Sequence, residues 1–139
     1  MPVNPPLSRN SGVACLFDII LNMKTYTGGC HCQKVRYEVD IENLSGVMSC
    51  NCSICSKRGW LLTFIPTEAF RLIKGEDEVT IYHFNNNLID HIFCKNCGTA
   101  SYGTGKDDKG NEMVAINVRC LDDVDIDSLV VTKYDGKNA

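Results

Sequence analysis

Short apolar stretches recur along the chain and are separated by polar or charged segments. Val35, Tyr37 and Val39 are separated by single charged residues, and this alternation places their side chains on one face of a β-strand. Apolar stretches of similar length predict further strands at residues 61–65, 70–72, 79–84, 89–93 and 113–118 and near residues 130–131. We therefore expect a mainly β fold built from short antiparallel sheets.

Few segments show a helical pattern. Residues 67–69, which follow Pro66, predict one short helix, and residues 53–57 predict a helical turn. Polar and glycine-rich residues predict a turn at 74–77 and a loop at 103–111. The helices are therefore expected to be minor parts of the fold.

Residues 1–22 differ in composition from the rest of the chain. Proline, serine, asparagine and glycine, which are typical of loops, are frequent there, and we expect a flexible extension before one folded domain at 23–139. An ordered helix over residues 14–23 that packs on the domain is the alternative. The apolar stretch 13–21 is short and contains Asp18, so a signal peptide is a poor interpretation and we expect a cytoplasmic protein.

The size and charge of the chain narrow the classes of function. A length of 139 residues corresponds to one domain. No apolar run approaches the roughly 20 residues that span a bilayer, so no membrane partner is expected. The net charge is −3 and the basic residues are scattered, which disfavours binding to nucleic acid because such binding usually uses a basic surface.

The nine cysteines are the most specific signal in the sequence. Seven of them lie in three motifs: Cys30 and Cys32, then Cys50, Cys52 and Cys55, then Cys94 and Cys97. An odd number of cysteines without a secretory signal argues against a disulfide framework. Such close spacings deliver thiolates to one metal ion, and Zn²⁺ is the ion that thiolate sets favour. Cys15 and Cys120 have no partner in sequence, and each is expected to be a small apolar filler or an exposed thiol.

The spacings also predict local geometry. In a Cys-x-Cys motif on an extended chain, both side chains leave on the same side and can reach one ion. His31, which lies between Cys30 and Cys32, is then expected to point away from the metal. Gly98 follows Cys97 and is suited to the left-handed backbone that closes a Cys-x-x-Cys turn.

Seven thiolates do not divide into two sets of four. One closed site of four thiolates leaves three, and three protein ligands with an open fourth position are typical of a catalytic zinc ion, so we expect two zinc ions per chain. Spacing alone leaves the grouping open. The Cys-x-x-Cys part of the middle motif can join the third motif as in a zinc ribbon, or the first and third motifs can form the closed site. A second, purely structural metal completed by His31 or His91 is a further alternative.

Several side chains near the cysteines are candidates for contacts with a substrate. Lys57 and Arg58 lie two and three residues after Cys55, and they either meet substrate carboxylates or belong to a solvated turn. His91 either lines a substrate cleft or lies on the surface. Trp60 and Phe64 are expected in the core.

The residues around the cysteines resemble those of a known family. Gly-Gly-Cys-His-Cys (28–32), Cys-Asn-Cys-Ser-Ile-Cys (50–55) and Phe-Cys-Lys-Asn-Cys-Gly (93–98) follow the order found in the glutathione-dependent formaldehyde-activating (GFA) family. The resemblance extends to residues 26–29, Gly46 and residues 116–122, and it covers roughly residues 25–136. That family shares its domain with centromere protein V and has the Mss4-like fold, so the resemblance implies this fold here.

The resemblance also implies roles for the cysteines. In the family the first and third motifs hold a structural zinc ion, and the middle motif holds a catalytic one. It thereby assigns Cys30, Cys32, Cys94 and Cys97 to the structural zinc and Cys50, Cys52 and Cys55 to the catalytic zinc.

The implied activity is that of a carbon–sulfur lyase. Such an enzyme catalyses the reversible addition of glutathione, or another small thiol, to formaldehyde or a related small aldehyde. A Cys₃ zinc can bind and deprotonate the thiol. Lys57 and Arg58 would orient the glutathione carboxylates, and His91 is the candidate acid or base.

Other classes of function stay open, because function resides in the site and not in the fold. The alternative is a non-enzymatic zinc module that binds a protein partner, which predicts two closed sites and no affinity for glutathione. A zinc ribbon that binds nucleic acid is a third hypothesis, and the acidic charge balance disfavours it.

Overall fold

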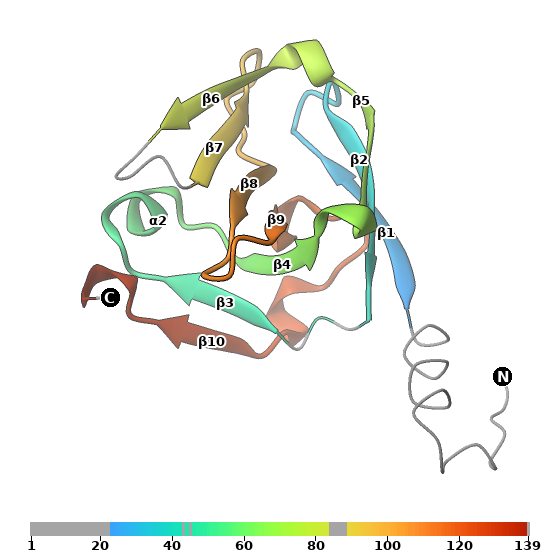
Figure 1. Cartoon of the computed structure of the whole chain (residues 1–139). Helices are drawn as coiled ribbons and strands as arrows, with labels where there is room; N and C mark the ends of the chain where they lie inside the picture. Colours follow the sequence, from blue (N-terminus) through green and yellow to red (C-terminus); the bar gives the residue numbers. More distant parts are fainter. Residues whose placement is uncertain (1–22, 43, 45, 84–88, 139) are drawn as a thin grey trace, which may run out of the picture.

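The computed structural model describes residues 23–42, 44, 46–83 and 89–138, which form two β-sheets (Figure 1). The first sheet is antiparallel, with three strands in the order β1-β2-β5. These strands are β1 (Lys24–Gly29), β2 (Arg36–Ile41) and β5 (Phe70–Lys74). The extension expected at residues 1–22 lies outside the described residues.

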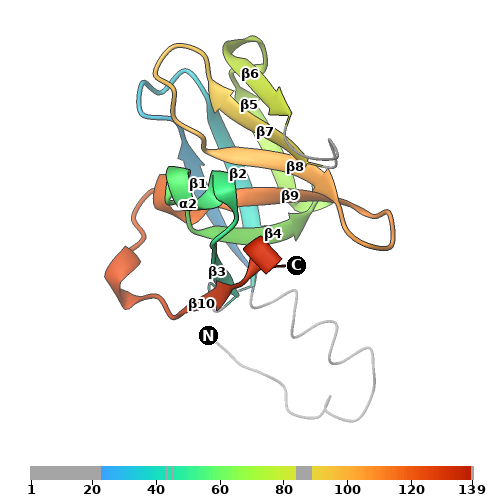
Figure 2. The same cartoon turned by 90° about the vertical axis from the view of Figure 1, so that its left-hand side faces the viewer.

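The second sheet has seven strands in the order β10-β3-β4-β9-β8-β7-β6 (Figures 1 and 2). They are β3 (Val47–Cys50), β4 (Leu62–Pro66), β6 (Val79–His83), β7 (Ile89–Cys94), β8 (Tyr102–Lys106), β9 (Glu112–Asn117) and β10 (Val131–Tyr134). All neighbours are antiparallel except β10 and β3, which are parallel. The predicted mainly β class is therefore confirmed, with one parallel pair added. Phe84, at the end of one predicted strand, lies outside the described residues.

Helices are short in the part of the chain that the structure describes. One α-helix, α2 (Ser53–Arg58), follows β3 and confirms the helical turn predicted there. The 3₁₀ helices are Thr67–Ala69, which confirms the other predicted helix, and Glu76–Glu78, Val118–Cys120, Ile126–Ser128 and Gly136–Asn138. None of the described helices is long and apolar enough to cross a bilayer.

The main core lies between the three-stranded sheet and one face of the seven-stranded sheet. Tyr37 of β2 is almost fully buried, and its ring centroid lies 5.3 Å from that of Phe70 and 5.7 Å from that of Tyr102. The Tyr37 hydroxyl donates a hydrogen bond of 2.9 Å to the carbonyl of Ser101, so its polar end is satisfied inside the core. Ile116 of β9 completes this packing from the other sheet.

The opposite face of the seven-stranded sheet carries a second, smaller cluster. Val114 and Ile116 of β9 belong to the main core, whereas Ala115 between them packs with Cys55 and Trp60. Adjacent residues of a strand point to opposite faces, so α2 and the residues that follow it cover the face away from the main core. The middle cysteine motif is thereby placed on that outer face.

The structure corrects several expectations. The predicted loop 103–111 is wrong, because its first part forms β8, and only the turn beyond β8 is irregular. Glycine is typical of loops, so Gly103 argued against a strand in the sequence. The strand nevertheless requires glycine here, because a Cβ atom at residue 103 would lie 2.9 Å from the carbonyl oxygen of Asp90. Phe64 is 43% exposed and not part of the core, because it is in register with Ala115 and its side chain therefore lies on the outer face. Trp60 is buried, as predicted.

Candidate metal centres

The structure gathers the seven clustered cysteines into two groups. Cys30, Cys32, Cys94 and Cys97 form the four-cysteine cluster, and Cys50, Cys52 and Cys55 form the three-cysteine cluster. In each group the sulfur atoms lie within 4.8 Å of one another, so each group can hold one metal ion. The zinc-ribbon grouping, in which the middle and third motifs share an ion, does not form.

The first half of the four-cysteine cluster is a turn between β1 and β2. The backbone N–H of Gln33 donates to the carbonyl of Cys30 at 3.3 Å, and Gln33 has a left-handed φ of 72°. An extended chain was expected at Cys30 and Cys32 and is therefore wrong here, because the tight turn is what brings their sulfur atoms to 3.6 Å. His31 is exposed and belongs to neither cluster.

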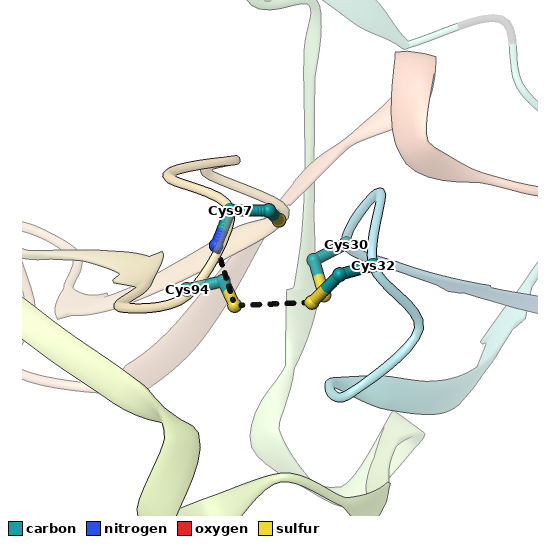
Figure 3. Close-up of side chains that lie close together, drawn as sticks. All are labelled: Cys30, Cys32, Cys94 and Cys97. Carbon is teal, nitrogen blue, oxygen red and sulfur yellow. Dashed lines mark hydrogen bonds between the residues drawn. The ribbon is translucent and has the colours of Figure 1, made fainter.

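The second half is the turn after β7. Cys94 ends the strand, and the N–H groups of Asn96 and Cys97 donate to its sulfur at 3.4 and 3.5 Å. Figure 3 shows the hydrogen bond from Cys97. Gly98 has a φ of 80° and closes the turn by a 2.8 Å bond from its N–H to the carbonyl of Cys94. The left-handed glycine predicted from the sequence is thus confirmed.

The spacing of these sulfur atoms suits zinc. The Cys30 and Cys32 sulfurs are 3.6 Å apart, and the Cys32 and Cys94 sulfurs are 3.7 Å apart (Figure 3). Four thiolates at the usual zinc–sulfur length of about 2.3 Å form a tetrahedron with edges of about 3.8 Å. The residues present therefore fit a closed tetrahedral thiolate site.

The thiols of this cluster differ in acidity. Burial raises the pKa of Cys30 to about 11. Burial also acts against the ionisation of Cys97, but hydrogen bonds with Thr99 and with the neighbouring cysteines outweigh it and lower the pKa of Cys97 to about 5. Zinc binds thiolates, so loading this site with metal releases protons from the less acidic thiols.

The three-cysteine cluster is assembled where β3 meets α2. Cys50 ends β3, Cys52 precedes the helix in an extended conformation, and Cys55 lies within it. The N–H of Cys52 donates to the Cys50 sulfur at 3.5 Å. Gly59 ends the helix with a φ of 67° and donates to the carbonyl of Cys55. The extended Cys-x-Cys geometry expected from the sequence is therefore present at this second motif.

Trp60 contacts this cluster directly. Its indole N–H donates a 3.3 Å hydrogen bond to the sulfur of Cys55. Burial raises the pKa of the Cys55 thiol to about 12, and this hydrogen bond acts in the opposite direction. Such outer contacts orient a metal ligand and tune its basicity. The sequence predicted only that Trp60 is in the core, because its distance from Cys55 along the chain does not indicate a contact with the sulfur.

Arg58 lies over two aromatic rings beside the cluster. Its guanidinium carbon is 5.3 Å from the ring centroid of Trp60 and 5.9 Å from that of Phe93. Its Nη1 is buried and makes no hydrogen bond to any described residue. Burial lowers the pKa of Arg58. Lys57 is exposed, as expected for a residue of a solvated turn. Arg58 is partly buried and does not fit that expectation.

His91 is also close to this group. It is buried, and its ring centroid lies 6.1 Å from that of Trp60. The surface position, one of the two expectations for His91, is therefore wrong. Burial and the positive charge of Arg58 lower the pKa of His91, which favours the neutral imidazole. Arg58 and His91 therefore both lie beside the ring of Trp60, next to the three-cysteine cluster.

Cys120 stays outside both clusters. It is half-buried, and its thiol points to the carbonyl of Ala100 at 3.9 Å. All eight cysteines in the described part of the chain, Cys120 included, are free thiols. Cys120 therefore offers a control for substitutions at the cluster cysteines.

Comparison with known proteins shows the family to which the chain belongs. The sequence profile of the family described as glutathione-dependent formaldehyde-activating enzyme matches residues 25–133. The chain belongs to the GFA family. It is 29% identical over 117 residues to an uncharacterised lyase of Schizosaccharomyces pombe, with 73% of this chain and 82% of that protein covered.

A crystal structure of a Rhodobacter sphaeroides protein shares the fold. It superposes with a TM-score of 0.69 at 28% identity and covers 78% of this chain and 99% of the other. The GFA membership and the lyase name of the yeast relative support a lyase-type enzyme. The two cysteine clusters supply groups that can hold metal ions in this GFA chain.

Proposed function

We propose that this protein is a zinc-dependent carbon–sulfur lyase that catalyses the reversible addition of glutathione to formaldehyde or a related small aldehyde. The observation that carries the proposal is the unequal division of the cysteines into clusters of four and three. Four thiolates complete a tetrahedron, whereas three leave one position for a substrate. Zinc ions in the two clusters would be structural and catalytic, respectively.

The addition forms one carbon–sulfur bond. The thiol sulfur of glutathione attacks the aldehyde carbon, the carbonyl π bond opens, and the proton of the thiol ends on the new hydroxyl oxygen. When bound to the three-cysteine cluster, zinc would supply a site at which an incoming thiol loses its proton near neutral pH. Cys50, Cys52 and Cys55 hold that site together, and the hydrogen bond from Trp60 fixes Cys55.

Arg58 is the proposed anchor for glutathione. Its buried Nη1 can donate to an acceptor brought by a substrate, and glutathione carries two carboxylates. The rings of Trp60 and Phe93 hold the guanidinium in place. Lys57 is exposed, so its contribution is the general attraction of an anionic substrate.

His91 is the proposed acid or base. The neutral form favoured by its surroundings can accept a proton, and it lies beside the ring that contacts Cys55. The cytoplasm suits this chemistry, because a reducing compartment keeps the cluster cysteines as thiols.

The test compares Cys52→Ser with Cys120→Ser. The addition also proceeds without a catalyst, so the measurement is the exchange rate between formaldehyde and its glutathione adduct at equilibrium, followed by NMR exchange spectroscopy. We expect Cys120→Ser to accelerate exchange as the unmodified protein does. Cys52→Ser should show the uncatalysed rate while keeping its fold and one zinc ion. Full acceleration by Cys52→Ser would overturn the proposal.

A further inference from the structure

The C-terminal end of the chain lies against the three-cysteine cluster. Strand β10 pairs in parallel with β3, and Tyr134 is in register with Cys50. The chain then turns into the 3₁₀ helix Gly136–Asn138, next to the connection from β3 to α2 (Figures 1 and 2). We call residues 134–138 the C-terminal strap. The match to the GFA family ends at residue 133, just before this strap.

Asn51 holds the strap in place through hydrogen bonds. This residue lies between the cluster cysteines Cys50 and Cys52, and its backbone N–H donates to the carbonyl of Tyr134 at 3.2 Å. Its side-chain Nδ2 donates to Asp135 at 2.9 Å. Its Oδ1 accepts from the backbone N–H of Lys137 at 2.8 Å. One residue of the cysteine motif is thus bonded to three positions of the strap.

Gly136 makes the closest approach. A Cβ atom built on Gly136 would lie 2.4 Å from the sulfur of Cys50 and 3.5 Å from the Cβ of Cys52. The first distance is far shorter than a carbon–sulfur contact allows. Gly136 is not among the described glycines with positive φ, so its backbone would accept alanine. The requirement for glycine is therefore steric and comes from the sulfur of Cys50.

We propose that the C-terminal strap is a wall of the second metal centre, and that Asn51 and Gly136 are positioning residues that hold it against Cys50. The inference rests on the proposed function in one respect, namely that the three-cysteine cluster binds a metal ion. The strap covers the Cys50 side of that centre, so a thiol or aldehyde has to approach from another side. Its close contact with the Cys50 sulfur also holds this side chain in the position from which it would bind the metal.

The experiment measures how firmly each zinc ion is held. The zinc-loaded protein is incubated with increasing amounts of a chelator, and the ions that remain are counted by native mass spectrometry. Asn51→Ala and Gly136→Ala are compared with Gly46→Ala, because a Cβ at Gly46 has no neighbour within 4 Å. A chain that ends at Tyr134 removes most of the strap without changing the cysteine motif.

We expect the unmodified protein and Gly46→Ala to retain two zinc ions to the same chelator concentration. Asn51→Ala, Gly136→Ala and the shortened chain should lose one ion at roughly 10–100-fold lower chelator concentration, as for other residues that support metal ligands. The other ion should be retained as before, which shows that the fold is intact.

Two results would overturn the inference. If the unmodified protein holds two zinc ions and all three variants retain both equally well, the strap inference alone fails. If the unmodified protein holds only one zinc ion under all conditions, the proposed function fails together with it.

Discussion

Trp60 connects the three-cysteine cluster to the groups around it. One edge of its indole donates to Cys55, its face lies under Arg58, and His91 is its neighbour. It is also the only tryptophan of the chain. A single side chain thus links a candidate metal ligand to the proposed substrate anchor and the proposed acid or base.

The two basic residues after Cys55 are expected to contribute unequally to substrate binding. Arg58→Met should weaken the binding of S-methylglutathione about tenfold or more, because a buried charge-assisted hydrogen bond is worth about 1.5–3 kcal/mol. Lys57→Met is the matched control and should change the affinity less than about threefold, since exposed charges contribute little. Isothermal titration calorimetry measures both, and equal effects of the two substitutions would contradict the role given to Arg58.

The sequence predicted the structure at single residues only where the spacing of a motif determines the local backbone geometry. The left-handed Gly98 and the membership of seven cysteines in close motifs could be read directly. The sulfur contact of Trp60 and the exposure of Phe64 could not, because both depend on which face of the sheet α2 covers. Lys57 and Arg58 are neighbours in sequence, and only the fold shows that one of them is stacked on rings.

Among the elements, β8 shows why a strand can escape prediction. Its sequence, Tyr102–Lys106, alternates with two glycines, which are usual in loops. The strand is nevertheless specified, because it pairs with β7 on one side and β9 on the other. Gly103 is required by the close approach of Asp90, a contact that the sequence does not show. Pairing and packing with the neighbouring strands, and not the local sequence pattern, therefore make residues 102–106 a strand.

Asn117 joins the end of β9 to neighbouring segments. Its Oδ1 accepts from the N–H groups of Leu61 and Arg119, and its Nδ2 donates to the carbonyl of Ala100 at 2.9 Å. Asn117→Ala leaves these groups without their partner, so we expect a loss of about 2 kcal/mol in the free energy of unfolding. Urea denaturation of the zinc-loaded protein measures the change.

Asn111, an exposed turn residue that bonds to Asp107, provides the control for this measurement. Asn111→Ala should cost less than about 1 kcal/mol, since water replaces the lost partner. If Asn117→Ala is as mild as Asn111→Ala, the buried side chain of Asn117 does not hold these segments together.

At the scale of the whole molecule, the four-cysteine cluster joins the two sheets. Cys30 and Cys32 follow β1 of the three-stranded sheet, whereas Cys94 ends β7 of the seven-stranded sheet, and Cys97 lies in the turn beyond it. A metal ion in this cluster would therefore act as a cross-link between distant parts of the chain. The mainly β class could be predicted from alternation, but this joining role requires knowledge of the topology.

Loss of that cross-link should lower the stability of the entire protein. Cys97→Ser is expected to reduce the melting temperature by about 10 °C or more, because the binding energy of a structural zinc ion is folding energy. Cys120→Ser, which leaves both clusters intact, should shift it by only a few degrees. Differential scanning calorimetry gives both values, and a small shift for Cys97→Ser would show that the cluster does not stabilise the fold.

The proposed function requires a zinc ion in the three-cysteine cluster with one position open to a thiol. Native mass spectrometry of the purified protein and of Cys52→Ser, each with and without glutathione, measures this. We expect two zinc ions and a glutathione adduct for the unmodified protein, but one zinc ion and no adduct for Cys52→Ser. Two zinc ions that ignore glutathione, or a single ion in the unmodified protein, would contradict it.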